Sequence, residues 1–148
     1  MTSHGGSGFL PEMHFMLLTA LALSATLQFD CPATIETRQQ QLGASPGWQA
    51  VTRNDQGEQH QPLSHRLDNL ALFDGDPDER AQLKPDNGDS DALHYWSLDR
   101  RNPRPFYLVC HYRETAITLQ QTLPAGISYC RVNQPEPYDL RGLICRNE

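Results

Sequence analysis

The chain's four cysteines, Cys31, Cys110, Cys130 and Cys145, are the feature that most restricts its fold. All four follow an apolar run of nine residues from Phe15 to Leu23. This run is too short for a membrane-spanning helix, which needs about 20 residues, but it matches the apolar part of a secretory signal peptide. An even number of cysteines in a small exported chain predicts disulfides rather than free thiols. The sequence therefore predicts an exported, oxidised protein held by two disulfides.

The N-terminal residues are expected to be a signal peptide over 1–25, in which 1–12 form an upstream extension. No Lys or Arg precedes Arg38, so the basic part of an ordinary leader is missing, and a buried N-terminal helix is the alternative. The remaining length suits one domain. We expect a single β-rich domain over 26–148, located in the periplasm and without a transmembrane segment in the mature chain.

The charge of the chain argues against nucleic acid as a partner. The formal net charge is −6, and the twelve Lys and Arg residues are scattered along the sequence. Phosphate backbones are bound by clustered cations. An acidic protein of this size suits a basic protein partner.

Apolar residues recur with a period of two more often than 3.6, which predicts a mainly β fold. The run 106–112 is apolar nearly throughout and is expected to form a central strand packed on both faces. We expect a small antiparallel sheet or sandwich, or a partly open barrel. The predicted strands are 31–37, 48–52, 66–73, 92–98, 106–113, 115–123, 127–132 and 142–146.

One short helix is predicted in the middle of the chain. Asp76 can cap it, Pro77 suits the first helical position, and Glu79 completes a capping box. Pro85 and the polar loop after it end the helix.

Four cysteines allow three disulfide pairings. If Cys110 and Cys130 lie on the first and third strands of a meander, they are about 9.6 Å apart, which is too far for a disulfide. This spacing disfavours Cys110–Cys130. We favour Cys130–Cys145, which would clamp the proline-bearing loop, with Cys31–Cys110, which would tie the N-terminal strand to the core, although the sequence leaves the connectivity open. A metal site is disfavoured because no Cys-x-x-Cys spacing occurs.

Acidic loops flank the predicted helix and are the predicted partner-binding site. Alternate carboxylates at their start imitate a calcium loop, but Glu79 and Pro85 stand where such a loop needs Gly and Glu. The solvated loop is therefore favoured over a calcium site. The predicted partner-binding residues are Asp74, Asp78, Asp86, Asp89 and Asp91.

No constellation of residues predicts catalysis. The run Gly43–Gly47 matches G-x-S-x-G, but Pro46 removes the backbone N–H that would help to form an oxyanion hole. The histidines lack metal-ligand spacing, and a hydrogen-bonded core or edge histidine is favoured over a catalytic base. We assign no catalytic residue, cofactor or metal. The histidines considered are His60, His65, His94 and His111.

Several of these motifs together resemble an uncharacterised family of small exported proteins from Gram-negative bacteria. The resemblance lies in Cys31-Pro32-Ala33-Thr34-Ile35, in the turn from Asp74 to Pro85, in Tyr107-Leu108-Val109-Cys110-His111-Tyr112, and in Leu123-Pro124 before Cys130. Some such proteins are encoded beside type VI secretion toxins, so the resemblance implies an immunity role. It brings no catalytic residues with it.

Three classes of function remain open. A protein that binds and neutralises a toxin or hydrolase is favoured, because a disulfide-linked β-domain with acidic loops suffices for that task. The alternative is a periplasmic module that binds a small ligand or an envelope component. An enzyme is the third class.

Overall fold

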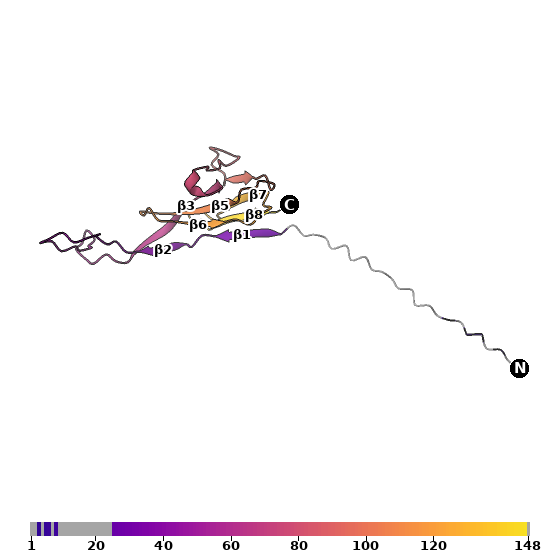
Figure 1. Ribbon diagram of the computed structural model, residues 1–148, viewed down its shortest axis with the longest axis horizontal. Helices are drawn as coiled ribbons and strands as arrows, with labels where there is room; N and C mark the ends of the chain where they lie inside the picture. The colour runs from indigo at the N-terminus through magenta and orange to yellow at the C-terminus, as the bar shows by residue number, and fades with distance from the viewer. Residues whose placement is uncertain (1–2, 4, 7, 9–24, 148) are drawn as a thin grey trace.

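The computed structural model describes residues 3, 5–6, 8 and 25–147. The apolar run of the predicted signal peptide lies outside these residues. Within them, eight strands form two antiparallel four-stranded sheets, and the only helical element is one 3₁₀ turn. Figure 1 shows the two sheets as layers, with a long excursion of the chain between β2 and β3. The predicted mainly β fold with two disulfides is confirmed.

The two sheets take their strands from separate parts of the chain. The first has the order β1-β8-β7-β4 and the second the order β2-β3-β5-β6. The first sheet comprises β1 (Thr26–Asp30), β8 (Gly142–Arg146), β7 (Tyr129–Asn133) and β4 (Tyr95–Ser97). The second comprises β2 (Thr34–Thr37), β3 (Leu63–Asp74), β5 (Phe106–Tyr112) and β6 (Thr118–Thr122).

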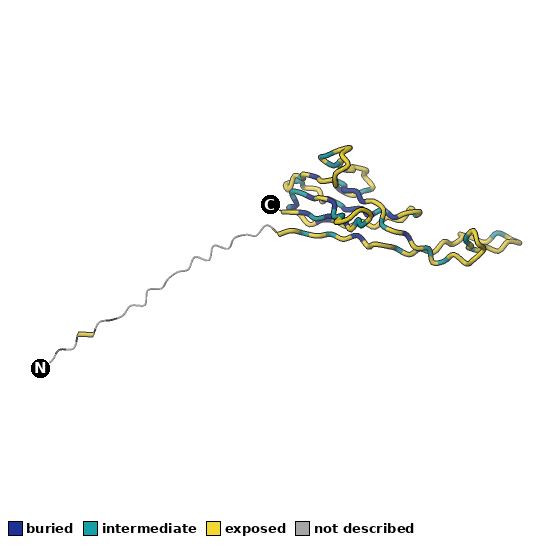
Figure 2. Tube along the Cα trace, turned by 180° about the vertical axis from the view of Figure 1, so that it is seen from behind, coloured by how far each residue is buried: buried dark blue, intermediate teal, exposed yellow. Residues whose placement is uncertain are grey.

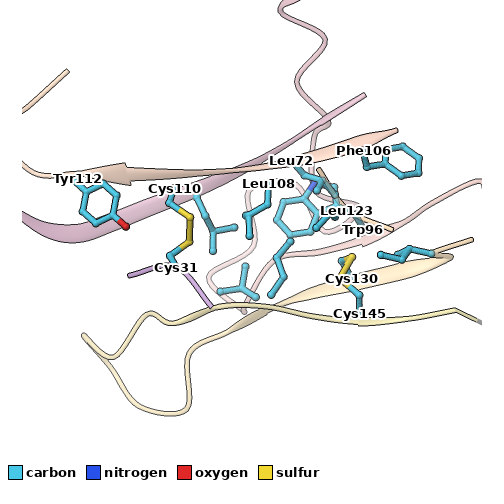
Figure 3. Close-up of a cluster of buried hydrophobic side chains, with 14 residues drawn as sticks. Cys31, Leu72, Trp96, Phe106, Leu108, Cys110, Tyr112, Leu123, Cys130 and Cys145 are labelled. Atoms are coloured by element: carbon cyan, nitrogen blue, oxygen red, sulfur yellow. A yellow bond between two sulfur atoms is a disulfide. The ribbon is translucent and has the colours of Figure 1, made fainter. Parts of the chain in front are cut away.

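The core lies between the sheets because alternate residues of their strands face inward. On β5, Leu108 is 1% exposed, and it packs in one cluster with Leu143 from β8 and Trp96 from β4. Figure 3 shows Leu108 and Trp96 between the two layers. The Tyr112 hydroxyl donates to the Pro32 carbonyl at 2.7 Å, and burial raises the pKa of this phenol. β5 lies between β3 and β6, as predicted for the central strand, and Val109 is buried on its other face.

Both disulfides pair as favoured above. Cys130 and Cys145 stand directly opposite each other on β7 and β8, with their Cα atoms 4.0 Å apart. Cys31 and Cys110 have Cα atoms 6.0 Å apart and join the end of the first sheet to the middle of the second. The geometric reason for excluding Cys110–Cys130 was wrong, because β5 and β7 belong to different sheets.

Two predicted strands differ most from the structure. The predicted strand 31–37 is divided, since β1 ends at Asp30 in one sheet and β2 begins at Thr34 in the other. Pro32 lies between them and has no N–H to donate to a ladder. The predicted strand 48–52 does not form. The nearest β pairing is an isolated antiparallel bridge between Arg53 and Gln59.

The predicted helix is limited to one 3₁₀ turn, η1 (Pro77–Glu79). Asp76 caps it as expected, accepting from the Asp78 N–H at 3.0 Å. Arg80 has a left-handed backbone, φ 63°, which ends the turn. The chain then returns along β3, where the Leu83 N–H donates to the Leu72 carbonyl at 2.8 Å. Pairing with β3 therefore replaces further helical hydrogen bonds.

Candidate partner-binding surface

The five predicted partner-binding aspartates belong to one stretch, residues 74–91, which we call the acidic segment. It runs from the end of β3 through η1 toward β4. In Figure 1, η1 and β4 lie on the opposite side of the two-layered body from β1. Part of the acidic segment therefore lies on the side of the body away from β1.

Two of the five aspartates hold the local structure together. Asp74 is half-buried, and its Oδ1 accepts from the Asn102 side chain at 2.9 Å. Asp86 Oδ2 accepts from the Ser97 N–H at 3.0 Å, which ties the segment to β4. These carboxylates are committed to hydrogen bonds within the fold.

The other three aspartates, Asp78, Asp89 and Asp91, are exposed. Asp89 and Asp91 make no side-chain hydrogen bond or ion pair in the described part of the chain. Their loop is nevertheless ordered by Asn87, whose Nδ2 donates to the Leu93 carbonyl at 3.1 Å. The Asp89 and Asp91 carboxylates are therefore exposed to solvent on a loop that the Asn87 side chain holds in one conformation.

The core side of the acidic segment is anchored by Trp96. This residue is 3% exposed, and its indole N–H donates to the Leu83 carbonyl at 3.1 Å. Glu79 forms an ion pair with Arg104 rather than returning to the backbone of Asp76 as a capping box requires. Packing and hydrogen bonds from distant residues thus position the segment.

The acidic segment does not assemble a metal site. Among the described residues, no group of three His, Cys, Asp or Glu side chains could hold a metal ion. The carboxylates of the segment are therefore not grouped around a shared metal position in the described residues.

The histidines and Ser45 do not form a nucleophile and base pair in the described residues. His65 is 5% exposed, and its Nδ1 lies 2.8 Å from the Arg113 carbonyl, so this nitrogen carries the proton and donates. Its Nε2 lies 2.6 Å from the Thr37 hydroxyl. The Ser45 hydroxyl accepts from the Gln41 amide at 2.7 Å in a loop. His65 is therefore a hydrogen-bonded core histidine that links β2 and β3 to the end of β5.

A family comparison decides the class of protein. The Type VI secretion system Tli immunity protein family matches residues 59–146 of the chain. The chain belongs to this family. This match supports the link to type VI secretion immunity proteins that the sequence motifs suggested. Membership of an immunity family implies a protein partner, namely a toxin.

The Tli family match covers β3 to β8, the acidic segment and both cysteines of the Cys130–Cys145 bridge. A relative in Azospirillum brasilense, described as an uncharacterized 16.3 kDa protein in the trpG 5' region, is 29% identical over 139 residues, covering 87% of this chain and 85% of the relative. No solved structure matches the chain. Among the described residues, no helix is both long and apolar enough to cross a membrane.

Two further surfaces lie outside the five predicted partner-binding residues. On the outer face of the first sheet, Tyr95 stacks on Tyr129 with 5.9 Å between the ring centroids. The Arg146 guanidinium carbon lies 4.2 Å from the centroid of the Tyr129 ring. The second surface is the excursion between β2 and β3, where Leu42 and Trp48 are strongly exposed. A signal for it was present, because no charged residue occurs from position 39 to 52.

Proposed function

We propose that the chain binds a type VI effector toxin and neutralises it by occlusion. The single observation that carries this proposal is the match to the Tli immunity family over residues 59–146. A rigid scaffold supports it, because two disulfides and a shared core reduce the ordering cost of binding. The chain acts in this proposal as a binding protein and not as an enzyme.

We also propose that binding takes place in the periplasm, after removal of residues 1–25. Two formed disulfides support this location, since disulfides persist in oxidising compartments. The domain that remains, 26–148, holds all the strands described above.

The test of this function is protection of a sensitive bacterium. We expect cells that make the cognate type VI effector in the periplasm to survive when the full chain is co-expressed, and to die without it. A variant chain without residues 1–25 stays in the cytoplasm and should not protect. Death of cells that carry the full-length, folded chain would contradict the proposed function.

The acidic segment is proposed to meet a basic surface of the effector. Exposed charges raise the association rate more than they strengthen the final complex, and salt screens them. Replacing Asp89 and Asp91 by Asn should therefore lower the association rate about threefold or more at low salt. The thermal midpoint should stay nearly unchanged, because neither carboxylate has a partner in the described fold.

The matched control replaces Glu36 and Glu114, two exposed acids outside the acidic segment, by Gln. It changes the net charge equally and should leave the association rate close to that of the unmodified chain. Stopped-flow or surface-based kinetics at two salt concentrations measure the difference. Equal rates for both double variants would place the steering charges elsewhere. Asp86 is omitted because its hydrogen bond to Ser97 would mix stability with binding.

A further inference from the structure

The excursion between β2 and β3, residues 38–62, projects far from the two-layered body. We call it the finger. Figures 1 and 2 show it extending beyond the sheets, and Figure 2 shows it mostly exposed. Three apolar side chains on it are open to solvent, with Leu42 92%, Trp48 84% and Val51 58% exposed. Exposed apolar side chains gathered on one projection mark an interaction site more often than scattered ones do.

Internal hydrogen bonds hold the finger in shape. The Gln61 amide donates to the Gln39 carbonyl and to the Thr52 hydroxyl, both at 3.0 Å, and so joins its two arms. The Asn54 side chain accepts from the Glu58 N–H at 2.9 Å and closes the turn over residues 54–58. A projection already held in one shape loses less conformational entropy on binding.

The middle of the finger is free of charge. Residues 39–52 contain no Asp, Glu, Lys or Arg, in a chain whose charged fraction is 20%. Interface centres are depleted of charge and enriched in tryptophan, whereas interface rims are polar. Trp48 also lines an open hollow of about 1150 Å³, whose other walls include Gln39, Ser45 and Gln61. These groups can accept and donate hydrogen bonds around an apolar centre.

We propose that the finger inserts into an uncharged, apolar-lined cleft of the effector, with Trp48 as the anchor. This inference rests on the proposed function and adds the element that makes the central contact. The family match begins at residue 59 and so assigns nothing to Leu42 or Trp48. A projecting segment with an uncharged middle fits an uncharged cleft. The acidic segment then steers the encounter from another part of the surface.

A lipid surface fits the finger less well than a protein cleft. Binding to anionic membranes depends on clustered Lys and Arg, and each adds about 1 kcal/mol. The finger contains two Lys or Arg residues, Arg38 and Arg53, which flank its neutral stretch. The chain as a whole carries a net charge of −6. The charge pattern therefore favours a protein partner.

The test compares Trp48→Ala with Tyr138→Ala, using the full chain and the purified cognate type VI effector. Tyr138 is a matched control, because it is an aromatic residue outside the finger and is 90% exposed. We expect Trp48→Ala to weaken binding at least about 30-fold, as is typical for loss of a tryptophan hot spot. Tyr138→Ala should bind within about twofold of the unmodified chain. Calorimetry gives both affinities, and the thermal midpoints should agree because neither side chain is buried.

Different outcomes separate the two proposals. If the unmodified chain binds the effector and Trp48→Ala binds equally well, the role of the finger is wrong and the proposed function stands. If the unmodified chain does not bind at all, the proposed function itself fails. Binding of the unmodified chain to phosphatidylcholine and phosphatidylglycerol vesicles, lost in Trp48→Ala, would overturn the protein cleft in favour of a membrane.

Discussion

Replacing Cys31 and Cys110 together by Ala is expected to lower the free energy of unfolding by about 4.5 kcal/mol, from the loop-entropy relation for a separation of 79 residues. The bridge is also the covalent link between the two sheets, and both cysteines are buried in the core. Without it, the end of β1 can separate from β5. Denaturant unfolding of the variant measures the loss.

The matched control removes the other bridge with Cys130→Ala and Cys145→Ala. Its separation of 15 residues predicts a smaller loss, about 3 kcal/mol. β7 and β8 remain hydrogen-bonded neighbours without it. A larger loss from the control than from the bridge between sheets would contradict this account of the core.

Trp96→Ala is expected to cost about 3 to 5 kcal/mol, the range for truncating a buried aromatic residue. Trp96 is 3% exposed and holds the acidic segment through the Leu83 carbonyl. Hydrogen exchange should therefore speed up at Leu83 and along the segment after it. Unfolding measurements give the loss of stability.

Trp96→Phe is the control, because it keeps an aromatic ring and removes the indole N–H. Its loss of unfolding free energy should be smaller, about 1 to 3 kcal/mol, because the Leu83 carbonyl would lose the hydrogen bond from the indole N–H. Equal costs for the two variants would mean that the hydrogen bond, and not the packing, carries the anchoring.

The local pattern of apolar residues was enough to predict most strands in the second half of the chain. The predicted strand 106–113 corresponds to β5, Phe106–Tyr112, and the predicted strand 142–146 corresponds to β8, Gly142–Arg146. In both, apolar residues follow one another with few interruptions, and a short apolar run of this kind is visible in the sequence. The sheet to which each strand belongs is set by distant partners, so the division between β6 and β7 could not be predicted.

The same limit applies to the candidate site. Asp86 and Asp89 look alike in the sequence, yet only Asp86 accepts from Ser97, eleven residues further along the chain. The apolar alternation around Trp48 predicted a strand, but no neighbouring strand pairs with it, and the residues form the finger instead. Such roles depend on contacts between distant parts of the chain.

The most direct test of the account is binding between the purified chain, with both disulfides formed, and the purified cognate type VI effector. Calorimetry should give a saturable complex, and adding the chain should abolish the effector's toxic activity in proportion to the fraction bound. No heat of binding, together with an effector that stays fully active in excess chain, would contradict the claim that this chain is the immunity protein of that toxin.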